Sequence, residues 1–209
     1  MIFILMVLNE QIKRIRKIIY ELSPQSEGIT EFLSQVKDFP ELLKHLNFDS
    51  ISSLKEFLEE NDYEDFQELK KEVDYFFDRR KRYFVSELDE ITRVVQELNR
   101  EENIEISVAD VLDLFARTKE TTLSPIIWSK LENTESNKIR KGEINKVKDL
   151  AKKYNKQNPI ELKKALQSGE YKRPMIIKFG DRYHLVSGNT RLSTAAAIGM
   201  KPQVLIAEL

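Results

Sequence analysis

The residues best suited to chemistry in this chain of 209 residues are Ser187, Gly188, Asn189, Thr190 and Arg191. Gly188 has no Cβ, so the backbone can turn tightly there and approach a ligand. Exposed N–H groups at a helix start, together with the positive end of the helix dipole, bind anions. Arg191 adds a guanidinium whose donors match the oxygens of a phosphate. The five residues therefore predict a phosphate-binding turn.

The elements on either side of this turn must hold it in place. The sequence predicts a short strand over 182–186 before the turn and an alanine-rich helix after it, ending at Gly199. We expect Asn189 or Thr190 to cap that helix, since both side chains can accept from its first N–H groups.

Further strands and helices are predicted around the 182–199 segment. An apolar strand over 175–179 is joined to the 182–186 strand by a hairpin turn at Gly180-Asp181, and a last strand covers 203–207. Two helices precede them, over 143–154 and from Asn158 to about Gln167. This order predicts a small sheet packed on helices.

The first 115 residues follow a different pattern, with apolar residues at helical spacing almost throughout. Residues 63–98 contain no Gly or Pro and predict one long helix, or two with a bend near 78–82. Ser107 is expected to cap another helix. Residues 121–137 show no regular pattern and are expected to be irregular. The predicted fold class is α+β, with a helical N-terminal region and a small sheet domain.

Charge divides the chain in the same way. Residues 1–120 hold 17 Lys or Arg and 27 Asp or Glu, a net −10, whereas residues 121–209 hold 17 and 8, a net +9. We therefore expect two domains: an acidic, all-helical region over 1–120 and a basic domain over 121–209. A basic domain attracts anions such as nucleotides or nucleic acid.

Composition also excludes several classes. The chain has no Cys and only two His, which rules out disulfides, thiolate catalysis and cysteine zinc sites. The apolar start, Met1–Leu8, is far shorter than the ~20 residues that span a membrane and lacks the flanks of a signal peptide. We expect it to begin a helix, and we expect a cytoplasmic protein with no membrane segment and no protein-bound metal cluster.

The strand over 175–179, the hairpin turn, the 182–186 strand, the Gly188-x-x-Arg191 turn and the alanine helix together resemble the ParB/sulfiredoxin superfamily, whose members are often labelled ParB-like nucleases. The resemblance covers roughly residues 124–209 and extends to Asn137–Lys141, which is similar to the Asn-x-Arg segment of that family. Residues 128–137 also resemble a stretch found before ParB-like domains in phage-encoded proteins of unassigned role.

The resemblance implies a nucleoside triphosphate, ATP or CTP, held with Mg²⁺ and used for hydrolysis or phosphoryl transfer. It excludes sulfiredoxin chemistry, because Asn189 and Thr190 stand where that reaction needs Cys. It also departs from partition ParB proteins: a single Arg191 replaces their Arg pair, and Ser187 replaces an acidic residue often found before the glycine. A full DNA clamp is therefore not expected.

Residues outside the turn complete the predicted nucleotide site. Arg140 and Lys178 are expected to add positive charge, and His184 is a candidate for contact with a base, although a structural histidine is the simpler interpretation. Phosphoryl transfer needs Mg²⁺ and an acidic or water-orienting group. Glu143 and Glu132 are the candidates for catalysis, since they flank the Asn137–Arg140 segment.

Two alternatives remain open at this stage. The chain is either this nucleotide-binding protein or a non-catalytic interaction protein of phage or plasmid type, with a protein or nucleic-acid partner and a degenerate ParB-like domain. A DNA nuclease ranks lowest, because residues 121–209 have only 8 acidic residues and a nuclease needs clustered carboxylates for metal.

Overall fold

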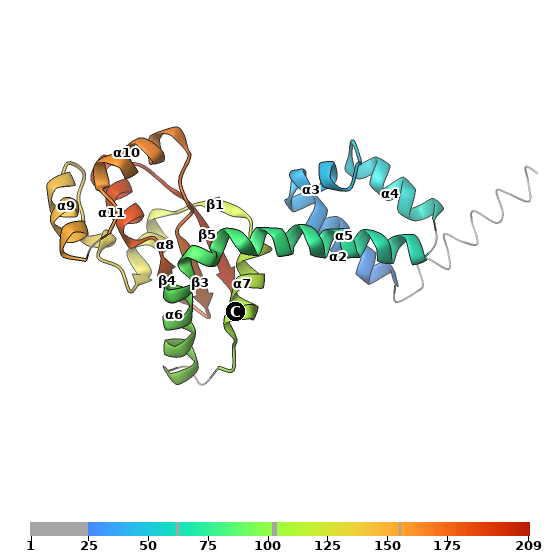
Figure 1. The fold of residues 1–209 in the computed structure, drawn as a ribbon, viewed down its shortest axis with the longest axis horizontal. Coiled ribbons are helices and arrows are strands. Elements are labelled where there is room, and N and C mark those ends of the chain that lie inside the picture. Colours follow the sequence, from blue (N-terminus) through green and yellow to red (C-terminus); the bar gives the residue numbers. More distant parts are fainter. Residues whose placement is uncertain (1–24, 62, 102–103, 155) are drawn as a thin grey trace, which may run out of the picture. The chain divides into compact units, whose positions relative to one another are not determined.

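The computed structural model describes residues 25–61, 63–101, 104–154 and 156–209, and the chain forms two compact units, Met1–Phe77 and Asp78–Leu209. The apolar start at Met1–Leu8 lies outside the described residues. The described residues form helices and a five-stranded mixed sheet, which confirms the α+β class (Figure 1). No helix in the described part of the chain combines the length and the apolar character needed to cross a membrane.

The first unit is helical. Its described elements are α2 (Gln25–Asp38), α3 (Pro40–His45), α4 (Ile51–Glu60) and most of α5 (Tyr63–Lys81). Its core is rich in aromatic rings that meet edge to face. Phe32 lies 5.4 Å from Phe66, and Phe39 lies 5.1 Å from Phe77, between ring centroids.

The second unit carries the sheet. Its helices are η1 (Arg82–Glu87), α6 (Leu88–Glu101), α7 (Val108–Ala116), α8 (Pro125–Lys130), η2 (Ser136–Lys138), α9 (Ile144–Lys153), α10 (Pro159–Ser168) and α11 (Asn189–Ile198). Its strands are β1 (Glu120–Thr122), β2 (Leu131–Glu132), β3 (Met175–Phe179), β4 (Arg182–Ser187) and β5 (Gln203–Glu208).

The strands lie in the order β1-β5-β3-β4-β2. The hairpin of β3 and β4 is antiparallel and central, as the Gly180-Asp181 turn predicts. Strand β5 joins β3 in parallel, and β2 joins β4 in parallel. The three strands predicted at 175–179, 182–186 and 203–207 are confirmed.

Helices cover both faces of this sheet. The apolar sides of α6 and α7 pack on one face, around Ile91, Phe115 and Ile177. On the other face, Leu192 of α11 and the α8 residues Ile127 and Trp128 join a second apolar cluster with β3, β4 and β5. Helices α9 and α10 then pack on α11, on the side away from the sheet (Figure 1).

The boundary between the units differs from the expected one. It falls after Phe77, whereas the charge division predicts a boundary after residue 120. Helices α6 and α7 belong with the sheet because their buried residues form one core with it, including Phe84, Val94 and Leu98. Net charge describes the solvent-exposed side of these helices, and packing is decided by the other side.

Two segments refine the sequence predictions. The stretch over 63–98 takes the bent alternative, because α5 ends at Lys81 and the short 3₁₀ helix η1 leads into α6. Residues 121–137, expected to be irregular, contain α8: the Ser124 hydroxyl accepts from the Ile127 N–H, and Pro125 occupies the first turn.

Candidate functional site

The turn before α11 has the backbone geometry of an anion site. Gly188 has φ +103° and ψ +19°, a left-handed conformation that favours glycine. A Cβ at this position would lie 2.8 Å from Cα of Pro174, so a side chain there would force the backbone to shift. The first intrahelical bond runs from the Leu192 N–H to the Gly188 carbonyl. The three preceding N–H groups therefore start the helix without an intrahelical acceptor.

No side chain caps this helix start. The prediction that Asn189 or Thr190 caps it is wrong. The Asn189 Oδ1 atom instead accepts from the Thr134 hydroxyl at 2.7 Å and from the Glu135 N–H at 3.3 Å. Asn189 thus ties the turn to the 133–136 segment, and the N–H groups of α11 stay directed at the space in front of the helix.

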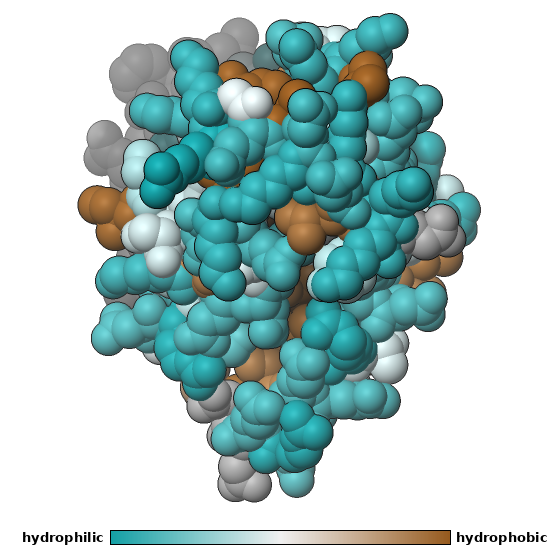
Figure 2. Space-filling view, turned by 90° about the vertical axis from the view of Figure 1, so that its left-hand side faces the viewer, coloured by the Kyte–Doolittle hydropathy of each residue, from teal (hydrophilic) through white to brown (hydrophobic). Residues whose placement is uncertain are grey.

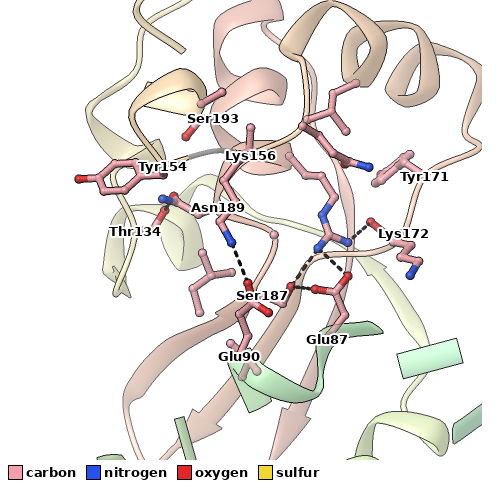
Figure 3. A pocket seen from close by; sticks show the side chains of 18 of the residues that line it. Glu87, Glu90, Thr134, Tyr154, Lys156, Tyr171, Lys172, Ser187, Asn189 and Ser193 are labelled. Atoms are coloured by element: carbon pink, nitrogen blue, oxygen red, sulfur yellow. Dashed lines mark hydrogen bonds and ion pairs between the residues drawn. The ribbon is translucent and has the colours of Figure 1, made fainter. Parts of the chain in front are cut away.

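That space is a cleft of about 1160 Å³ within the second unit, large enough for a nucleotide-sized ligand. All five residues from Ser187 to Arg191 line it. Figure 3 shows the opposite walls: Glu87 and Glu90 come from the junction of η1 and α6, and Lys156 and Tyr154 come from the region between α9 and α10.

Arg191 is buried and does not present its donors to open solvent. Its Nη2 atom donates to the Ser187 Oγ at 2.9 Å and lies 3.2 Å from the Glu87 Oε1, while its Nη1 donates to the Lys172 carbonyl at 2.8 Å. The Ser187 hydroxyl also donates to Glu87 Oε2. The guanidinium predicted to hold a ligand phosphate thus holds a carboxylate of this chain.

Two lysines stand on the walls of the cleft. The Lys156 ammonium pairs with Glu90 at 3.1 Å and spans the cleft between the α9–α10 loop and α6 (Figure 3). Lys172 donates to the Ser86 hydroxyl, and its ammonium lies 5.9 Å from the Tyr83 ring centroid. Both ammonium groups can reorient toward a ligand, because lysine makes point-charge contacts on a flexible stem.

The two predicted catalytic carboxylates do not line the cleft. Glu132 forms two hydrogen bonds to Arg182, at 3.0 and 2.8 Å, and these bonds lower the pKa of its carboxyl group. Glu143 precedes α9 and accepts from the Arg140 backbone N–H at 2.8 Å, which is the main reason its pKa is lowered. Both are structural acceptors here.

The outlying cations and the histidine also lie away from the cleft. Arg140 is exposed, and Lys178 pairs with Glu208 at 2.5 Å, a contact that raises its pKa. His184 is buried in β4, with its Nδ1 atom 3.2 Å from the Glu132 carboxylate. This arrangement fits the structural interpretation of the histidine.

The carboxylates of this cleft do not form a preassembled metal site. Among the residues that the structure describes, no group of three His, Cys, Asp or Glu is arranged to hold a metal ion. Four glutamates line the cleft, Glu87, Glu90, Glu135 and Glu170. Glu87 and Glu90 are engaged in ion pairs. Mg²⁺ is usually held by one or two carboxylates beside the ligand phosphates, so Glu135 and Glu170 are the cleft residues that would hold it.

Glu87 is the residue that the sequence patterns miss. It lies 104 positions before Arg191, and in the sequence it reads as one acidic residue of a solvated helix face. Only the packing of α6 on the sheet brings it to the turn.

Compared with protein-family models, with curated proteins and with solved structures, the chain has no match.

Proposed function

We propose that the second unit binds a nucleotide through its phosphates, in the cleft at the start of α11. The observation that carries the proposal is the start of the ten-residue helix α11, which no side chain caps and which faces a cleft of about 1160 Å³. The glycine before it has no room for a Cβ unless the backbone shifts. Backbone N–H groups of this kind bind phosphate without help from a cation. Lys156 and Lys172 add two positive charges on the walls.

The cleft also has surfaces suited to the rest of a nucleotide. The inner sides of α9 and α10 contribute apolar side chains, among them Leu150 and Leu162, and the half-exposed Tyr154 lies at the same wall (Figure 3). Aromatic rings stack on bases without selecting among them. The resemblance of the strand, glycine turn and alanine helix to the ParB/sulfiredoxin superfamily supports the same ligand class.

Binding is the part of the function that the geometry supports. The carboxylates available for hydrolysis or phosphoryl transfer in the cleft are those of Glu87, Glu90, Glu135 and Glu170, and they replace Glu132 and Glu143 as the candidates. Glu87 and Glu90 are each neutralised by a basic partner, so neither of these two is arranged as a free general base. We therefore propose a nucleotide-binding protein and do not extend the proposal to turnover.

Calorimetric titration with ATP, CTP and their non-hydrolysable analogues, with and without Mg²⁺, tests this proposal. The double variant Lys156→Gln/Lys172→Gln should weaken binding by about a hundredfold, since each charged hydrogen bond contributes roughly 1.5 kcal/mol or more. The matched control is Lys163→Gln/Lys164→Gln, which removes two exposed lysines of α10 outside the cleft. If the wild-type protein binds no nucleotide, the proposal is wrong.

A second candidate function, the interaction protein, is favoured by the charge around α9 and α10. Residues 138–168 hold ten Lys or Arg against three Asp or Glu, a net +7. Eight of the ten form no ion pair with a residue that the structure describes; the exceptions are Lys146 and Lys156. The side of the molecule that carries α9 is hydrophilic over most of its area (Figure 2). Such a surface suits the backbone of a nucleic acid.

The same pair of double variants separates the two functions. If this surface binds DNA, Lys163→Gln/Lys164→Gln should weaken binding to a labelled 20-base-pair duplex and reduce the salt dependence of that binding by about two phosphate contacts. The cleft variant should affect nucleotide binding far more than duplex binding. A duplex affinity that does not fall as salt rises would contradict the second candidate.

A further inference from the structure

Glu87 occupies the position where a ligand anion would meet Arg191. Each of its two carboxylate oxygens contacts one polar side chain of the turn. One accepts from the Ser187 hydroxyl, and the other lies 3.2 Å from the Arg191 guanidinium. The pair is well enclosed, with side-chain exposures of 14% for Glu87 and 10% for Arg191. All three residues line the same cleft as the helix start.

A carboxylate and a phosphate are interchangeable acceptors for a guanidinium fork. While Glu87 holds Arg191, a phosphate at the start of α11 gains nothing from this arginine and is repelled by the carboxylate beside it. A ligand can use Arg191 only if one of its own anionic groups replaces the Glu87 carboxylate. Glu87 is the last residue of η1 and directly precedes α6, so its side chain lies at a junction of two helical segments.

We propose that Arg191 and Ser187 form a second phosphate subsite, which Glu87 fills in the free protein and which selects ligands with at least two linked phosphates. This inference rests on the proposed function. The first phosphate binds the N–H groups of α11 and presents the second to Arg191 at high effective concentration, which favours displacement of Glu87. A single phosphate group has no second anion to present, so it occupies the first subsite alone.

The test compares inorganic phosphate with pyrophosphate and tripolyphosphate by calorimetry, on the wild type and on Glu87→Gln. The amide keeps an acceptor for Ser187 and Arg191 but removes the competing charge. We expect the variant to raise the affinity for pyrophosphate and tripolyphosphate about tenfold, as for one weakened charge pair, and to change the affinity for phosphate less than about twofold.

Glu90→Gln is the matched control, since it removes one negative charge from the same cleft without touching Arg191. It should leave the ratio of pyrophosphate to phosphate affinity unchanged. If both variants raise that ratio equally, the effect is general electrostatics and the second subsite is refuted. If the wild type binds these anions and Glu87→Gln leaves the ratio unchanged, the subsite is refuted while the proposed function stands.

A measurement on the wild-type protein does not depend on the stability of any variant. Hydrogen exchange of the backbone over residues 82–90 should become faster with saturating pyrophosphate, because Glu87 is released, and should not change with phosphate. Equal exchange in both would refute the displacement. If neither the wild type nor Glu87→Gln binds any of the three anions, the proposed function itself is wrong.

Discussion

Replacement of Gly188 by Ala tests the geometry on which the turn before α11 depends. Two costs add at this position. A non-glycine residue at φ +103° is strained by about 1–2 kcal/mol. The new Cβ would also lie 2.8 Å from both Cα and Cβ of Pro174, and overpacking against atoms that cannot move aside costs typically about 1–3 kcal/mol. We expect a loss of about 3 kcal/mol, a large share of the roughly 5–15 kcal/mol that stabilises a domain.

Gly169→Ala provides a control that separates the two costs. Gly169 ends α10 with φ +80°, also left-handed, but a Cβ there would meet nothing within 4 Å. This variant should therefore lose only the conformational part, about 1–2 kcal/mol. The difference of about 2 kcal/mol between the variants measures the contact with Pro174.

Urea unfolding followed by tryptophan fluorescence gives this difference directly. The chain has one tryptophan, Trp128, which packs in the second unit and donates to the Ser136 hydroxyl at 2.9 Å. Its emission therefore reports on the unit that contains the site. With a denaturant slope of about 2 kcal/mol per molar, the two midpoints should differ by about 1 M. Equal losses in both variants would show that Pro174 does not press on the turn.

Two further predictions concern the same unit. The pKa of Glu132 is lowered, chiefly by its hydrogen bonds to Arg182, so its stabilising effect is complete above the unfolded-state pKa and is lost as pH falls through the lower folded-state pKa. Glu132→Gln should therefore unfold more easily at pH 7 and lose less stability than the wild type on acidification below about pH 4.5. The measurement is the urea midpoint, followed by Trp128 fluorescence, as a function of pH. If the stability of the variant falls with pH as steeply as that of the wild type, the role of the Glu132–Arg182 pair is contradicted. A fragment of residues 78–209 should unfold cooperatively. A fragment of residues 121–209 should not, because it lacks α6 and α7, which cover one face of the sheet. Cooperative unfolding of the shorter fragment would contradict this packing argument.

Much of the second unit follows from local signals in the sequence. Gly199 and Gly169 end helices in the left-handed conformation, and the Asn158 side chain accepts from the Ile160 N–H at the start of α10. These signals are readable because glycine, proline and capping residues act within three or four positions of themselves. Helix α8 carries the same kind of signal in Ser124-Pro125, so it was open to prediction from the sequence.

Which residues make up the site is harder to predict from the sequence, because it depends on packing. Five predicted ligand residues, from Ser187 to Arg191, do line one cleft, since they are consecutive. The sequence suggests Glu132 and Glu143 only by their position along the chain, and in the structure each has an acceptor role elsewhere in the fold. No local pattern pairs Glu87 with Arg191, because their contact exists only once α6 lies on the sheet.

The difference between the expected boundary and the one in the structure, and the carboxylate that sequence patterns miss, have one physical cause. Helix α6 is acidic in its first turn, at Asp89 and Glu90, and buries Ile91, Val94, Val95 and Leu98 against the sheet. The apolar side places the helix in the second unit, and this packing brings Glu87, the residue before the helix, to the turn at 187–191. The acidic charge that suggested a separate region is therefore part of the site. Any change that loosens α6 from the sheet should release Glu87 from Arg191 as well, so the stability of this helix and the availability of the proposed second phosphate subsite should vary together.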